Sequence, residues 1–151
     1  SYELKTFCLL AMVRAAARSV ITMFTLKNLG LAFVFLWFMI GGIAHFTNTE
    51  FFAAIMPPYI DLGYHNAIVY ISGVFEILGA IGILIPTLRQ WAGNGLLLLV
   101  VAVSPANIHM WLHPELFPDV PPVFLSVRLV VQVLLLALIW WCTRMPRRAA
   151  A

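Results

Sequence analysis

Charged residues are scarce in this sequence. They make up 10% of its 151 positions, whereas soluble domains carry about a quarter. Hydrophobic residues make up 63%, and the mean hydropathy is +0.98. This composition excludes an ordinary soluble domain and predicts an integral membrane protein whose surroundings are the lipid bilayer. The few basic residues are scattered at the ends of apolar runs, so they indicate no nucleic-acid partner.

Cysteine is almost absent as well. The two cysteines, Cys8 and Cys142, form no CxxC pair and no metal-ligand spacing. The topology predicted below puts both on the reducing side of the membrane, so no structural disulfide is expected. A helical-bundle thiol oxidoreductase is therefore excluded. The chain also lacks haem-type axial ligand pairs and a flavin motif, so no intrinsic cofactor is expected.

Lysine and arginine are missing from two segments, residues 47–65 and 113–122. Both segments carry acidic residues and prolines. Every basic residue except Arg128 falls on the opposite side of the apolar runs, and the positive-inside rule then places both termini in the cytoplasm. The two acidic loops face outward on this prediction.

Four apolar runs of about 20 residues each are long enough to cross a bilayer as helices. Short connections favour antiparallel neighbours, so we predict an all-α, polytopic membrane four-helix bundle over residues 29–142. The predicted spans are 29–46, 66–85, 91–112 and 123–142. Residues 1–28 are predicted to form a basic amphipathic helix on the cytoplasmic surface, since a signal peptide or an import presequence fits less well. Residues 143–151 are predicted to form a basic cytoplasmic tail.

Glu76 is a carboxylate near the middle of the second predicted span. An uncompensated ionisable group at that depth costs about 2.5–3.5 kcal/mol. Gln132 falls at a similar depth in the fourth span, while Asn107 and Arg128 lie somewhat nearer the outer side. With His45 at the outer end of the first span, each helix contributes a polar residue to the outer half of the bundle.

Arg128 is the predicted counter-ion of Glu76, because its side chain can reach down one helical turn. Ser72, Glu76 and Gly79 share one helix face, and the two small residues would let a neighbouring helix approach closely. Two interpretations stay open. The polar cluster either holds the helices in register, or it forms a site that binds a polar head group or moves protons.

The histidines suggest a metal hypothesis that the spacing does not favour. His109 and His113 are four residues apart, a separation that can chelate a metal on a helix. The other two, His45 and His65, complete no recognised motif with them. We therefore predict no metal site.

Several short motifs resemble the bacterial DoxX-like family of small integral membrane proteins. They are Gly42–Phe46, Pro57–Pro58, Ser72–Gly79, Ser104–Met110, and Arg128 with Gln132 and Trp140–Trp141. The resemblance covers residues 29–142. It implies a four-helix membrane protein of the bacterial inner (plasma) membrane with His45, Glu76, Asn107, Arg128 and Gln132 as its motif residues.

The resemblance also implies a function, that of a redox-associated subunit with an outward-facing polar pocket. A quinone head group is the ligand expected first, because apolar walls with a few polar groups suit it. Two alternatives remain open. The chain could be a non-catalytic accessory subunit of a larger membrane protein complex, or a binder of a hydrophobic small molecule, as the EXPERA-type sterol proteins are. Whether it is an enzyme is not decided by the sequence.

Overall fold

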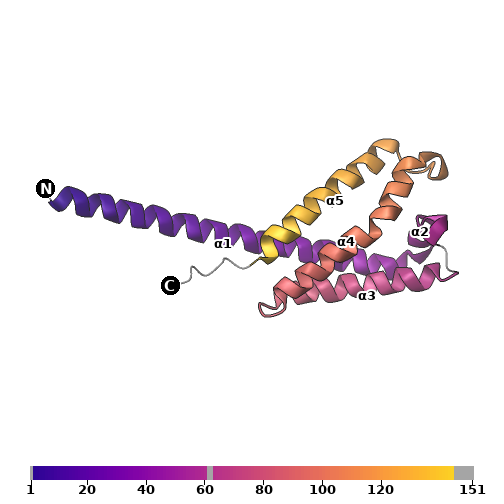
Figure 1. Cartoon of the computed structure of the whole chain (residues 1–151), viewed down its shortest axis with the longest axis horizontal. Helices are drawn as coiled ribbons and strands as arrows, with labels where there is room; N and C mark the ends of the chain where they lie inside the picture. Colours follow the sequence, from indigo (N-terminus) through magenta and orange to yellow (C-terminus); the bar gives the residue numbers. More distant parts are fainter. Residues whose placement is uncertain (1, 61–62, 145–151) are drawn as a thin grey trace.

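Helices make up all the regular secondary structure of residues 2–60 and 63–144, which are the residues that the computed structural model describes. The four long helices are, in chain order, α1 (Tyr2–Thr47), α3 (His65–Leu84), α4 (Arg89–Leu112) and α5 (Pro122–Thr143). The connections contain the short elements α2 (Thr49–Ala54), η1 (Pro58–Ile60) and η2 (Pro114–Leu116). The predicted all-α class is confirmed (Figure 1).

Four of these helices are long and apolar enough to cross a membrane, as predicted. The helices α3, α4 and α5 begin and end within two residues of the second, third and fourth predicted spans. The side of the membrane on which the termini lie stays a prediction. From residue 145 onward, the predicted basic tail lies outside the described residues.

The first helix differs from the prediction. Residues 2–47 form one continuous helix of 46 residues, about 69 Å long at 1.5 Å per residue, instead of a separate surface helix followed by a span. The segment lacks proline, and its alanines favour helix, so nothing in it ends the helix before the span begins. Its first half extends past the other helices (Figure 1), and apolar side chains such as Phe7, Val20 and Phe24 are exposed there.

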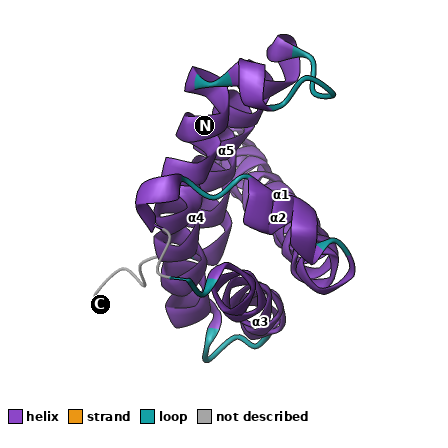
Figure 2. Ribbon diagram, turned by 90° about the vertical axis from the view of Figure 1, so that its right-hand side faces the viewer, coloured by secondary structure: helices purple, strands orange, loops and turns teal. Residues whose placement is uncertain are grey.

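The four long helices form a ring in the order α1, α3, α4, α5, with α5 closing against α1. The view along the bundle in Figure 2 shows α1 with α3 on one side and α4 with α5 on the other. We call the end with the α3–α4 turn the inner end and the opposite end the outer end. Buried residues from all four long helices form a hydrophobic core toward the inner end. Among them are Phe38, Ile83, Leu96 and Ile139.

A second, smaller core lies at the outer end. Ile55, which follows α2, packs with Met110 of α4 and Leu125 of α5. This contact connects the α1–α3 side of the molecule to the α4–α5 side. The polar residues of the spans lie between the two cores.

Glycines set how closely the helices approach one another. A Cβ on Gly42 of α1 would lie 2.9 Å from the backbone oxygen of Gly73 in α3. A Cβ on Gly93 of α4 would collide with Thr143 of α5, which is fully buried. Small residues permit this backbone proximity between membrane helices, and they determine which helices become neighbours here.

Candidate functional site

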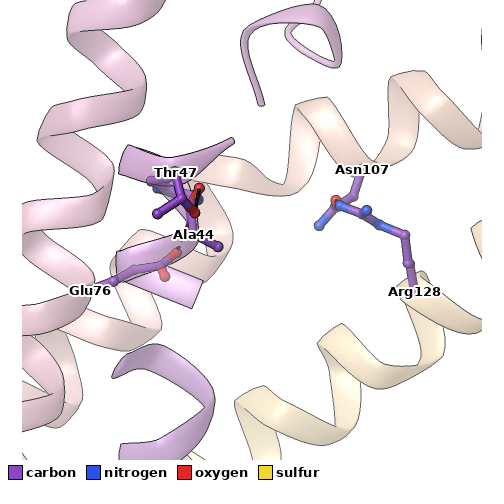
Figure 3. Close-up of polar contacts among 6 residues, drawn as sticks. Ala44, Thr47, Glu76, Asn107 and Arg128 are labelled. Carbon is purple, nitrogen blue, oxygen red and sulfur yellow. Dashed lines mark hydrogen bonds and ion pairs between the residues drawn. The ribbon is translucent and has the colours of Figure 1, made fainter. Parts of the chain in front are cut away.

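The polar side chains of the spans form two separate groups, one on each side of the ring. Glu76 of α3 lies with His45 of α1, whereas Arg128 of α5 lies with Asn107 of α4 (Figure 3). The two groups lie apart in this view. Each group is built from neighbouring helices, and each has its own chemistry.

His45 of α1 and Glu76 of α3 lie side by side in the helix interface. The His45 Nε2 atom lies 3.8 Å from Oε1 of Glu76, and the two side chains are only 9% and 13% exposed. Gly41 provides space for the carboxylate, because a Cβ there would lie 2.7 Å from Oε2 of Glu76. On its other side the His45 ring meets Phe52 edge to face, with ring centroids 4.1 Å apart. The carboxylate thus lies beside an imidazole and a glycine.

A continuous hydrogen-bonded chain joins α4 and α5, and we call it the α4–α5 polar chain. Arg128 Nη2 donates to Asn107 Oδ1 at 2.7 Å, and Asn107 Nδ2 donates to Gln132 Oε1 at 2.6 Å. Gln132 Nε2 then donates to the Ser104 hydroxyl at 2.6 Å, which donates to the Val100 carbonyl at 2.9 Å. Each amide acts once as donor and once as acceptor, so one unbroken series of hydrogen bonds runs along the α4–α5 interface.

A further hydrogen bond joins α4 and α5 toward the outer end. The indole Nε1 of Trp111 donates to the Ser126 hydroxyl at 3.1 Å. Hydrogen bonds between transmembrane helices are worth about 0.6 kcal/mol each on average. Together they hold α4 and α5 as a pair along the outer half of the bundle.

The predicted ion pair between Glu76 and Arg128 is wrong. Glu76 pairs with His45, and Arg128 bonds to Asn107. The reason is the order of helices in the ring, where α3 packs against α1 and α4, while α5 packs against α4 and α1. Similar depth therefore does not bring the two charges together. The proposed neighbours of Arg128, Asn107 and Gln132, do lie beside it.

Two residues of the polar groups were not predicted from the sequence. Ser104 ends the side-chain part of the α4–α5 polar chain, and its position three residues before Asn107 places it on the same helix face. Gly41 provides the space beside Glu76. The spacing to Asn107 could have revealed Ser104, whereas the role of Gly41 depends on which helix lies opposite.

A small group of ionisable side chains lies at the end of α4 and in the loop after it, and two of them, His113 and Glu115, are exposed. The His109 and His113 ring centroids are 4.8 Å apart, and His113 Nδ1 lies 3.1 Å from Oε1 of Glu115. Hydrogen bonding to its own backbone N–H, and secondarily to His113, lowers the pKa of Glu115 from its ordinary value. No group of three or more metal-ligating side chains occurs within residues 2–60 and 63–144.

The apolar helices and their buried polar contacts define a small, multi-pass α-helical membrane protein. A family model described as "Domain of unknown function (DUF8561)" matches residues 34–143. That match covers well over half of the 151-residue chain, and the chain belongs to this family. Neither a curated protein nor a solved structure matches it.

The family match corrects the DoxX-like resemblance, which is wrong. Residues 34–143 match DUF8561, and the DoxX family is not found. Small residues beside isolated polar groups are needed wherever membrane helices pack closely, so the short motifs around Gly42 and Glu76 are less specific than they looked. The support that the resemblance lent to a redox role and to a bacterial inner-membrane location is thereby removed.

Proposed function

We propose that this protein binds a lipid-soluble molecule through a polar head group that carries hydrogen-bond acceptors. The head group would enter between the α1–α3 pair and the α4–α5 pair and bind Arg128. This proposal extends the coarser finding that the chain is a small membrane protein with four apolar helices.

The proposal rests on the burial of Arg128 and on its lack of an anionic partner among the described residues. Arg128 is the cation that lies inside α5, about 9 Å along the helix from Pro122, and its side chain is part-buried. Its hydrogen-bond partner in the described chain is the neutral amide of Asn107. Glu76, the carboxylate within the spans, lies beside His45 and makes no ion pair with Arg128. An intramembrane cation without an anion is costly, and a ligand oxygen would lower that cost.

A quinone head group is the first ligand to test. Its carbonyl oxygens accept hydrogen bonds from guanidinium donors, and its isoprenoid tail suits the lipid-facing surfaces of the helices. No haem, flavin or thiol motif accompanies the site in the sequence, so electron transfer would need a partner. Binding alone is therefore the function we assign to Arg128.

The test is a titration of the purified full-length chain in neutral detergent with a short-tailed quinone. Trp111 lies on the α4–α5 seam. Because the chain has five tryptophans, the quenching that is lost in Trp111→Phe reports binding there. Replacing Arg128 by Gln should weaken binding at least about tenfold, because hydrogen bonds from charged groups contribute roughly 1.5–3 kcal/mol. The matched control is Arg18→Gln, which removes an exposed arginine outside the bundle.

Equal quinone binding by the wild type and the Arg128→Gln variant would contradict the assignment to this site. Mass spectrometry of small molecules that co-purify with the chain tests the ligand class without a chosen probe. Recovery of a molecule without any hydrogen-bond acceptor, such as a plain hydrocarbon, would reject the acceptor-bearing head group and favour a binder of purely hydrophobic small molecules.

A second candidate function is favoured by the first half of α1. This half extends past the bundle (Figure 1) and exposes apolar side chains, among them Phe7, Val13 and Phe24. Exposed apolar surface of this extent usually marks an interaction site. The chain would then be an accessory subunit of a larger membrane complex. Co-purification at low detergent tests this, and a stable monomer without partners would count against it.

We propose that the protein lies in the plasma membrane with both termini in the cytoplasm. In a bacterial host this would be the inner membrane. The support is the distribution of charge, because the loops 47–65 and 113–122 contain no lysine or arginine.

A further inference from the structure

We infer that the inner end of the bundle binds the phosphate of an anionic phospholipid. The site consists of Lys27 of α1, Arg89 of α4 and Arg144 just after α5, which we call the inner basic site. It lies at the opposite end of the helices from the outer-half polar groups. It is independent of the proposed function, and the failure of one would leave the other standing.

Close helix contacts bring these three cations together. Gly30 of α1 lies against Cys142 and Trp141 of α5, and Gly93 of α4 lies against Thr143. The end of α5 is therefore enclosed by α1 on one side and α4 on the other. Arg89 joins this end through its Nε, which donates to the carbonyl of Ile83, a residue that packs in one core with Cys142.

Arg144 is held in place by its neighbours. Its guanidinium lies 3.7 Å from the ring centroid of Trp140, and Nη2 donates to Asn94 Oδ1 at 2.6 Å. The backbone carbonyl of Arg144 accepts a hydrogen bond from Lys27 Nζ at 2.9 Å. These contacts fix the position of two positive charges before any ligand arrives, which lowers the ordering cost of binding.

Some donors of the inner basic site lack hydrogen-bond partners among the described residues. Arg144 Nε is buried without a hydrogen-bond partner. Arg89 uses Nε to donate to the Ile83 carbonyl at 2.9 Å, and its terminal nitrogens make no hydrogen bond or ion pair within the described part of the chain. The ion pairs found among described residues lie at Glu76 and Glu115, in the outer half and the outer loop. The three cations thus have no carboxylate counter-ion there.

A phospholipid suits this arrangement better than a free anion. Trp140 and Trp141 lie at the same level, and tryptophan rings favour the membrane interface. Exposed apolar side chains such as Leu29 continue from the site toward the outer end, where acyl chains would lie. Basic sites between transmembrane helices on the cytoplasmic side bind anionic head groups by this combination of charge and apolar surface.

The experiment is a native mass-spectrometry titration of the full-length chain in neutral detergent. The probes are phosphatidylglycerol and phosphatidylcholine with identical acyl chains. Phosphatidylglycerol should bind more tightly to the wild type. Lys27→Gln and Arg89→Gln should each weaken phosphatidylglycerol binding about fivefold and leave phosphatidylcholine binding unchanged.

Arg14→Gln is the matched control, because it removes one exposed positive charge from α1 outside the bundle. An equal loss in Arg14→Gln and Arg89→Gln would overturn the site, since net charge alone would then explain binding. Equal binding of the two lipids to the wild type would also overturn it. Inorganic phosphate at the same concentration should not compete, and full competition would reject a lipid as the ligand.

Thermal unfolding without added lipid identifies a variant that fails to fold. Lys27 makes a structural hydrogen bond, so its replacement could disturb the helix contact. Arg89→Gln tests the site in that case, because it leaves the Lys27–Arg144 hydrogen bond in place and removes only one hydrogen bond of its own, from Nε to the Ile83 carbonyl. A folded Arg89→Gln variant with wild-type lipid preference would overturn the inference.

Discussion

Glu76 and Arg128 each bring an ionisable group into an apolar helix, and each is accommodated by a different neighbour. Glu76 lies beside the imidazole of His45 at 3.8 Å, while Arg128 donates to Asn107 at 2.7 Å. Membrane helices tolerate such groups only when they face other helices or a ligand. Their partners therefore decide what each residue does.

The pairing of Glu76 can be tested by a double-mutant cycle. Glu76→Gln and His45→Asn should lose less stability together than the sum of the single losses, with a coupling of about 0.5–1.5 kcal/mol, because they contact each other. Glu76→Gln and Arg128→Gln should be additive. The measurement is thermal unfolding in detergent, and strong coupling in the second cycle would restore the rejected ion pair.

Asn107 is the central member of the α4–α5 polar chain, because it accepts from Arg128 and donates to Gln132. Asn107→Ala should cost about 1–2 kcal/mol, since it leaves both neighbours without that partner. Asn66→Ala removes an amide from an exposed position at the start of α3 and should change stability by no more than about 0.5 kcal/mol. Similar losses in both variants would contradict the role of the chain.

Helix α1 and helix α3 owe their close contact to glycines. The contact between Gly42 and Gly73 is limited by the backbone oxygen of Gly73, which cannot move away as a side chain could. It also determines the register in which Glu76 falls level with Gly41. Packing at the level of whole elements thus creates the environment of the carboxylate.

Alanine substitutions distinguish tight from open glycines. Gly42→Ala should destabilise the protein by about 1–3 kcal/mol, because the added methyl overfills the contact. Gly95→Ala, inside α4, has nothing within 4 Å of the added Cβ and should be neutral or stabilising by about 0.5–1 kcal/mol. Unfolding in detergent measures both, and a neutral Gly42→Ala would refute the tight crossing.

The predicted topology places both ends of the described chain in the cytoplasm. Cys8 is exposed near the N-terminus and Cys142 is buried, so Cys8 is a natural reporter. In intact cells an impermeant maleimide should leave Cys8 unlabelled, whereas Tyr59→Cys in the outer loop should react. Labelling of Cys8 from outside would reverse the predicted orientation.

The element content of the protein was predictable because it depends on local sequence. The spans that became α3, α4 and α5 follow from runs of apolar residues long enough for a bilayer. The grouping of Asn107, Gln132 and Arg128 was also predictable, since their depths agree and the helices that carry them are joined by a short loop. The continuity of α1 was missed, because its basic residues suggested a change of environment at a place where the helix does not end.

The sequence by itself determined that the chain is a helical membrane protein and where each polar residue lies along its own helix. Both follow from composition and from a fixed rise per residue. Only the tertiary structure decided that Glu76 meets His45 and that Lys27 donates to the carbonyl of Arg144 at the end of α5. Neighbour identity depends on how four helices pack around one another, and here glycines on α1, α3 and α4 select the contacts.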